Sequence, residues 1–141
     1  TFNREKIIQP YKNEDVRIAV AEQKIPIDSL KFLANDISSY VRGAVASNPR
    51  TPRDILYKFM NGSLIELYYL ARNPALPRDI FEALSNDYSD KVRERIGLNK
   101  STPIDILKKL TSDQMFSVSQ AARLTLRFLE ENPQQTRERD H

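Results

Sequence analysis

The 141-residue chain has no cysteine and no tryptophan, and its single histidine, His141, is the last residue. Without cysteine the chain can form neither disulfides nor thiolate metal sites, and it has no cysteine nucleophile. A lone terminal histidine is not the pattern of a catalytic or metal-binding cluster. The three glycines, Gly43, Gly62 and Gly97, are far apart, so there is no glycine-rich phosphate loop. We therefore expect no enzymatic activity and no bound metal or cofactor.

Long apolar runs are also missing. No stretch approaches the roughly 18 to 20 consecutive apolar residues of a membrane span, and no leader-like segment precedes the repeats described below. We expect a cytoplasmic protein that does not bind membranes, although the chain begins at Thr1 rather than Met and an upstream targeting segment would lie outside it. The composition, 40% hydrophobic and 29% charged, is that of an ordinary globular domain.

What the chain does have is an internal repeat of 25 or 26 residues. The stretch from Val16 to Ala21 returns from Val41 to Ala46. A Pro-x-Asp step also recurs, at Pro26/Asp28, Pro52/Asp54, Pro77/Asp79 and Pro103/Asp105. A fixed period in this range predicts stacked repeats, because each unit can bury its apolar face only against its neighbours.

Each repeat is predicted to contain two short helices. The first begins at the Pro-x-Asp step, where Thr51 and Thr102 are expected to be N-caps and the aspartates to reach back toward the cap. We expect Gly62 to end one first helix in the left-handed conformation. The second helix should end at Asn48-Pro49 and its counterpart Asn73-Pro74, because proline cannot continue the helix.

The pattern Val-Arg-x-Ala-Val-Ala-x-Asn-Pro-x-Thr-Pro-x-Asp-x-Leu is complete from Val41 to Leu56 and partial in the other repeats. It resembles the leucine-rich repeat variant family, over residues 16–124. The resemblance implies an all-α fold, a right-handed α-solenoid of about four to five two-helix repeats with some 3₁₀ helices, wound into a HEAT- or armadillo-like superhelix. It implies no activity. The iron–sulfur cysteine cluster of the family's best-known members is absent.

The two ends of the chain are expected to differ from the repeats. Residues 1–15 are predicted to be an N-terminal capping segment, in which Ile7, Ile8 and Tyr11 cover the first repeat. Residues 16–131 are predicted to form the helical-repeat domain. Its last helix, from Val118 to Glu131, is expected to close the stack with apolar side chains that include Leu124. Residues 132–141 are wholly polar after Pro133 and are predicted to be a disordered tail.

Cations gather in the turns that lead from a second helix into the next first helix. These are Lys24, Arg50, Arg53, Arg72, Arg78 and Lys100. Stacking would align them along one edge, onto which the free N–H groups of the first helices also open. Such a basic ridge can follow a phosphate backbone or an acidic protein surface, and it can equally be a solvated edge.

Three further features each have a functional and a structural interpretation. Arg17, Arg42 and Arg93 can contact a ligand, or they can pair with the aspartates that follow nearby first helices, Asp36, Asp87 and Asp113; we favour pairing. Tyr68 and Tyr69 can stack on a base or pack between helices; we favour packing. The repeated aspartates Asp28, Asp54, Asp79 and Asp105 are expected to be helix caps and not a metal site.

These patterns lead to one main functional hypothesis and an alternative. The main hypothesis is a non-catalytic interaction scaffold that binds a protein partner through the solenoid surface, because repeat folds present extended faces. The alternative is sequence-independent nucleic-acid binding through the basic ridge. An enzyme, as a fragment of a larger protein, ranks third. The identity of the partner and the oligomeric state stay open.

Overall fold

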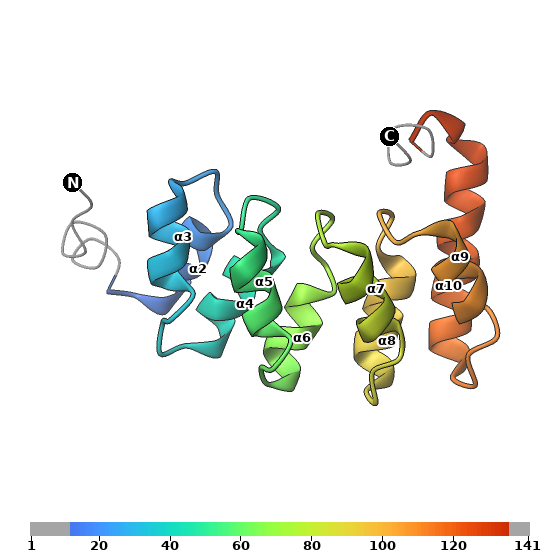
Figure 1. Ribbon diagram of the computed structural model, residues 1–141, viewed down its shortest axis with the longest axis horizontal. Helices are drawn as coiled ribbons and strands as arrows, with labels where there is room; N and C mark the ends of the chain where they lie inside the picture. Colours follow the sequence, from blue (N-terminus) through green and yellow to red (C-terminus); the bar gives the residue numbers. More distant parts are fainter. Residues whose placement is uncertain (1–11, 136–141) are drawn as a thin grey trace. The chain divides into compact units, whose positions relative to one another are not determined.

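The computed structural model describes residues 12–135, and these form α-helices without any strand (Figure 1). The helices are α2 (Glu14–Ala21), α3 (Ile27–Leu33), α4 (Ser39–Ser47), α5 (Arg53–Phe59), α6 (Leu64–Leu70), α7 (Arg78–Ser85), α8 (Asp90–Leu98), α9 (Ile104–Leu110) and α10 (Phe116–Glu131). The chain divides into two compact units, Thr1–Asn73 and Pro74–His141. The predicted contacts of Ile7, Ile8 and Tyr11 and most of the predicted tail lie outside the described residues.

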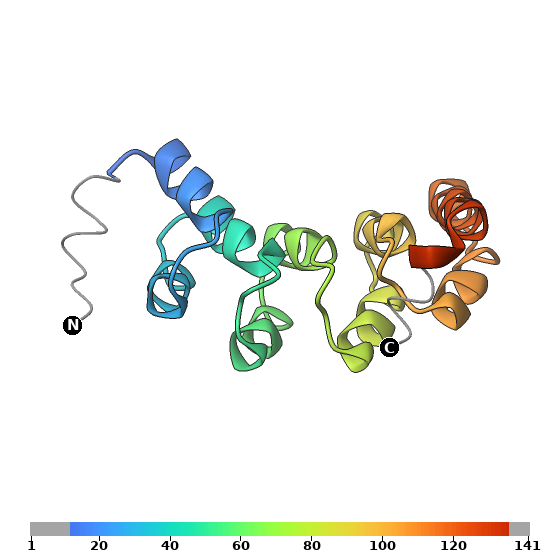
Figure 2. The ribbon, with the colours of Figure 1, turned by 90° about the horizontal axis from the view of Figure 1, so that it is seen from above.

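The first unit has two layers (Figure 2). The second helices of the repeats, α2, α4 and α6, lie side by side, with α4 packed against both of the others. The first helices α3 and α5 form the other layer. Between the layers lies a core of fully or almost fully buried aliphatic side chains: Leu30, Leu33, Val41, Val45, Leu56 and Leu70. Each first helix of this unit thus buries its apolar face within the unit.

The second unit is built in the same way from α7 to α10. The most extensive helix contact is between α8 and α10, where Gly97 permits a close approach. A Cβ atom at Gly97 would lie 3.2 Å from both the Ala121 Cβ and the Ala122 backbone nitrogen. The buried side chains are Ile80, Phe81, Leu84, Val92, Ile96, Leu107, Leu110 and Val118. Packed helix pairs, with no strand among the described residues of the unit, agree with the predicted α-solenoid class.

Buried asparagines tie successive second helices together in the first unit. Asn48, which ends α4 in an extended conformation, donates its side-chain amide to the carbonyls of Ala21 (2.8 Å) and Gln23 (2.9 Å). Asn73 does the same one repeat later, donating to Ala46 (2.8 Å) and Asn48 (3.0 Å). The carbonyls at a helix end lack partners within the helix, so each asparagine satisfies those of the preceding repeat.

The second unit has a different tie at its last repeat. Asn99 ends α8 as Asn48 ends α4, and its side-chain oxygen accepts from the Ser101 backbone N–H (2.9 Å). One repeat later the chain has Thr125 in the middle of α10, where its hydroxyl donates to the Gly97 carbonyl (2.6 Å). A hydroxyl donates one proton and an amide two, so Thr125 makes one of the two hydrogen bonds that Asn48 makes. Helix α10 continues through this position.

The predicted N-caps were wrong. The N-caps of α3, α5, α7 and α9 are the prolines, which make no side-chain cap hydrogen bond. In α9 the Asp105 carboxylate accepts from the backbone N–H groups of Asp105 and Ile106 in the first turn. The threonines serve the preceding helix instead. Thr51 donates its hydroxyl to the Val45 carbonyl (2.5 Å), and Thr102 donates to the Ile96 carbonyl (2.7 Å). Each buried hydroxyl thus donates a hydrogen bond to a carbonyl that has no partner within its own helix.

Other local predictions also need correction. No described glycine has a positive φ, and the end of α5 is closed by tight i→i+3 bonds up to Gly62. The 3₁₀ helices implied by the resemblance do not occur within residues 12–135. Helix α2 begins at Glu14, so the boundary predicted between residues 15 and 16 falls inside a helix. Leu124, expected to close the stack, is half exposed because it lies on the outer face of α10.

Replacing Asn48 with aspartate should test the asparagine tie. The shapes are nearly the same, but Asn48→Asp would place a buried carboxylate against two carbonyl oxygens and remove both donors. We expect a loss of about 3 kcal/mol or more in the free energy of unfolding, measured by urea denaturation. Asn35→Asp is the control, because the Asn35 amide contacts only the Lys31 carbonyl of its own helix, at 3.3 Å. Equal losses in the two variants would contradict the tie.

Candidate functional site

Arginines of the second helices form forked ion pairs with aspartates that follow first helices. Arg17 donates from Nε and Nη2 to the two carboxylate oxygens of Asp36, at 2.9 and 3.1 Å. Arg93 contacts Asp113 in the same way, at 2.8 and 3.3 Å. All four side chains are largely buried. Both pairings agree with the structural interpretation, and the fork fixes the guanidinium in one orientation.

Arg42 departs from this pattern. Asn61, which is neutral, occupies the place of the aspartate in the repeat after Arg42, and Arg42 pairs instead with Glu66 of α6 at 3.2 Å. Glu66 also forms a capping box with Ser63 at the start of α6. Arg42 keeps a second contact, from Nη1 to the Asp36 carbonyl (2.6 Å). The altered third repeat therefore keeps an ion pair with the preceding repeat, through a different carboxylate.

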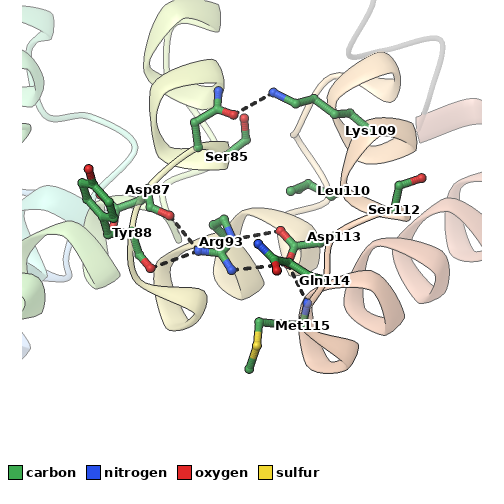
Figure 3. Close-up of a pocket in the computed structure, with 11 residues that line it drawn as sticks. Ser85, Asp87, Tyr88, Arg93, Lys109, Leu110, Ser112, Asp113, Gln114 and Met115 are labelled. Atoms are coloured by element: carbon green, nitrogen blue, oxygen red, sulfur yellow. Dashed lines mark hydrogen bonds and ion pairs between the residues drawn. The ribbon is translucent and has the colours of Figure 1, made fainter.

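A groove of about 730 Å³ lies within the second unit (Figure 3). One wall comes from the end of α7 and the turn after it, including Asn86 and Tyr88. The other wall comes from the end of α9 and its following turn, including Lys109 and Met115, and Arg93 of α8 lies between them. A smaller groove of about 400 Å³ occupies the equivalent place between α3 and α5 in the first unit.

The charged groups in the larger groove are paired with other protein groups. Besides its fork to Asp113, Arg93 donates from Nη1 to the carbonyls of Asp87 (2.7 Å) and Tyr88 (3.1 Å), and Lys109 donates to the Asn86 side-chain oxygen (2.8 Å). The hydrogen bond to Asp113 is the main cause that raises the pKa of Arg93. The charged groups of the groove are therefore hydrogen-bonded within the protein. Its walls are polar, and among the described residues they contain no activated nucleophile or base.

Large apolar side chains are exposed beside this groove. Tyr88 is fully exposed on one side, and Met115 and Phe116 are exposed on the other. Sequence reasoning missed all three, because it looked for apolar residues at helical spacing and these lie in turns or at a helix start. The available pattern was the recurring Asp-x-Ser turn, which has Ile37 and Tyr88 at its middle position.

The basic ridge is divided between the two units. In the first unit, the asparagine ties bring the chain near Gln23, Asn48 and Asn73 together, so the adjacent cations lie along one edge. These cations are Lys24, Arg50, Arg53 and Arg72, and all are exposed. Arg72 lies 5.5 Å from the centre of the Tyr69 ring. The other three form no ion pair within residues 12–135.

The two ridge cations of the second unit are engaged locally. Arg78 pairs with Asp105, with which it makes two hydrogen bonds, and with Glu82 at 3.1 Å. The hydrogen bond from Arg78 lowers the pKa of the Asp105 carboxyl. The Lys100 ammonium lies 4.1 Å from the centre of the Phe128 ring, a cation–π contact. Both ridge cations of the second unit therefore have a local partner, unlike Lys24, Arg50 and Arg53 in the first unit.

Tyr69 packs inside the first unit. A Cβ atom at Gly43 would lie only 2.5 Å from the Tyr69 Cδ2, so the ring rests directly on the glycine of α4. The Tyr68 and Tyr69 rings meet edge to face, with centroids 5.5 Å apart. With Gly43 on one side and Arg72 nearby, the ring of Tyr69 has a packing role, which supports the structural interpretation of this pair over base stacking.

Comparison with family models, with curated protein sequences and with solved structures gives no match for this chain. The likeness to the leucine-rich repeat variant family therefore rests on the repeat pattern alone. Among residues 12–135, no group of three or more acidic or histidine side chains is placed to hold a metal ion, and no helix is long and apolar enough to cross a membrane.

The Arg93–Asp113 pair predicts how stability depends on pH. Burial opposes ionisation of Asp113, but hydrogen bonds from Arg93 and the Met115 N–H outweigh it and lower the pKa of this carboxyl. At neutral pH the Asp113 carboxyl is ionised in both the folded and the unfolded protein. As the pH falls below about 4, the unfolded chain binds the proton first, so the pair's contribution is lost toward the lower pKa of the folded state.

Thermal unfolding between about pH 7 and pH 2.5 should show this loss. We expect Asp113→Asn to cost about 2 kcal/mol at neutral pH and to flatten the acid limb of the stability curve. Asp54→Asn is the control, because Asp54 is exposed and forms no ion pair among the described residues. An acid limb as steep in Asp113→Asn as in the unchanged protein would contradict the assignment.

Proposed function

We propose that the protein is a non-catalytic scaffold that binds a protein partner through the groove side of the second unit. The main support for this proposal is the set of exposed apolar side chains beside the groove, Tyr88, Met115 and Phe116. Their polar surroundings are already hydrogen-bonded within the fold, so an approaching surface gains apolar contact without having to break these ion pairs. The exposed apolar side chains lie on both sides of the polar groove, so a partner surface that spans the groove can contact them together.

We also propose that the helix pairs are four to five repeats of the leucine-rich repeat variant type, wound as a right-handed, HEAT- or armadillo-like solenoid. Two features support this proposal. The asparagine ties recur with the sequence period, at Asn48 and Asn73. The forked arginine–aspartate pair also recurs, once in each unit. A scaffold of this class presents its turns and grooves as repeated surfaces.

Capture experiments with a pair of aspartate variants should test the protein-binding proposal. The full chain is immobilised and exposed to nuclease-treated extract of its native cell, and we expect a protein to be retained. Phe116→Asp should lower its recovery at least tenfold. Leu64→Asp should not, although Leu64 is also exposed and also the first residue of its helix. Aspartate is favourable in the first turn of a helix, so both variants should fold.

The outcomes of the capture separate the candidates. Retention from untreated extract that is lost after nuclease treatment would favour nucleic-acid binding. Equal losses for Phe116→Asp and Leu64→Asp would place the contact elsewhere, and no retained protein would contradict the proposal.

A second candidate function is nucleic-acid binding at the edge of the first unit. It is favoured by one observation: Lys24, Arg50 and Arg53 are exposed along one edge without ion pairs among the described residues. Three or four cations of this kind can contact phosphates without reading bases. The exposed carboxylates Asp28 and Asp54 follow in the same helix starts and weaken the field, so we rank this function second.

A salt titration with duplex DNA and with single-stranded RNA would test the second candidate. If about four phosphates are contacted, log K should fall against log salt with a slope between about −3 and −4. Arg50→Glu combined with Arg53→Glu should abolish binding. Arg78→Glu should leave it unchanged, because Arg78 is already paired with Asp105. The absence of binding at low salt would eliminate this function.

A further inference from the structure

The groove between α3 and α5 in the first unit combines an apolar lining with several charged side chains. Its volume is about 400 Å³, within the range of ligand-binding pockets. The apolar lining includes Ile55 and Phe59, both of which are buried. The charged side chains that line it are Lys31, Arg42, Asp54, Lys58 and Glu66. The groove is therefore able to contact an apolar group and a charged group at the same time.

Lys31 of α3 and Lys58 of α5 bring unpaired ammonium groups to this groove. Both side chains are exposed, and neither ammonium has a hydrogen bond or an ion pair within residues 12–135. The second unit has Glu82 at the position of Lys31 and Lys109 at the position of Lys58. Glu82 pairs with Arg78, and Lys109 donates to a side-chain oxygen across its own groove (2.8 Å). The first unit thus leaves available the positive charge that the second unit neutralises or engages.

Arg42 adds a third cation, which is held less completely than its counterparts. Its side chain is 25% exposed, compared with 13% for Arg17 and 14% for Arg93. Arg17 and Arg93 each donate to both oxygens of an aspartate, whereas Arg42 makes one contact with Glu66, at 3.2 Å. With its bond to a backbone carbonyl, Arg42 uses two of the five N–H groups of a guanidinium. A further acceptor can therefore bind Arg42 without breaking its pair with Glu66.

The carboxylates of the groove decide which kind of anion fits. Glu66 is engaged by Arg42, but Asp54 is exposed and has no ion pair among the described residues. A chain of phosphates would bring several negative charges close to Asp54, and like charges repel. A peptide can instead present one carboxylate to the cations and a backbone N–H to Asp54. The mixture of charges therefore favours an acidic peptide segment over a nucleic acid.

We propose that the groove between α3 and α5 binds a glutamate- or aspartate-containing segment of a protein. The carboxylate of the segment binds between Lys31 and Lys58, beside Arg42, and a neighbouring apolar side chain packs on Ile55 and Phe59. The cations supply specificity, because a neutral segment would cover both ammonium groups without pairing them. This site lies in the first unit and goes beyond the function proposed for the second unit.

A peptide titration of the full chain would test the site, followed by backbone-amide NMR spectra. The probe is a capped peptide of Glu-Leu-Glu-Ser repeats, and its counterpart has glutamine at every glutamate. The salt concentration is about 0.15 M, at which exposed charges are screened beyond about 8 Å. We expect the glutamate peptide to shift the amides of Ile55 and Phe59 but not that of Leu110, which lines the second groove. The glutamine peptide should bind at least tenfold more weakly.

Two pairs of lysine substitutions separate the site from general attraction to a basic protein. Lys31→Gln combined with Lys58→Gln should weaken binding of the glutamate peptide about tenfold, because two ion pairs are lost. Lys91→Gln combined with Lys108→Gln is the control and should weaken it less than twofold. These lysines of the second unit are also exposed and also lack a side-chain partner among the described residues, so the same charge is removed. All four positions are exposed, so both variants should keep the melting temperature.

Each of the other outcomes overturns the inference. Equal weakening by the two pairs of substitutions would show that net charge alone attracts the peptide. Equal binding of the two peptides, or no binding of either, would show that the groove does not recognise a carboxylate. Tighter binding of inorganic phosphate or duplex DNA, lost in Lys31→Gln with Lys58→Gln, would assign the groove to phosphates. None of these results depends on the capture experiment with Phe116→Asp, so this site and the proposed function can fail separately.

Discussion

The rest of each unit depends on closing the ends of its second helices. These helices are short and end inside the protein, so their last carbonyls cannot turn to water, and a buried carbonyl without a donor is costly. Asn48, the C-cap of α4, and Asn73, two residues beyond the C-cap of α6, donate their amides to carbonyls of the preceding repeat. Each side chain therefore links the end of one second helix to the end of the preceding one. These links recur with the repeat of 25 or 26 residues.

The arginine–carboxylate pairs act at the opposite ends of the same helices. Asparagine joins the C-terminal ends, and Arg17 or Arg93 joins the N-terminal end of a second helix to the turn of the next repeat. Helices held at both ends have little freedom to slide, which suits a stack whose layers are otherwise joined by non-directional aliphatic contacts. In the third repeat the aspartate is absent and Glu66 replaces it from within α6. The ion pair is therefore preserved while the residue that supplies it changes.

The sequence predicted the helix pairs, their core residues and the two aspartate pairs, because periodicity and charge sign are visible in a linear pattern. It did not predict what Asn48 and Thr51 do. Both have strong local roles in helix caps and turns, and those roles hid their hydrogen bonds to the preceding repeat or helix. In the candidate site, the sequence identified the ridge cations as a set. It did not predict that Arg78 would form an ion pair with Asp105. Exposure of Tyr88 depends on the turn geometry, which periodicity does not describe.

The contacts that stabilise the stack also decide where its surface is available for binding. Arg93 is held by Asp113 and the turn carbonyls, so it cannot serve as a free cation, whereas Tyr88 in the same turn is fully exposed. Where the arginine is missing, as beside Gly62, the turn carries no large side chain. A repeat can thus acquire a binding residue at the middle of this turn without a change in its core, because that position contributes nothing to packing.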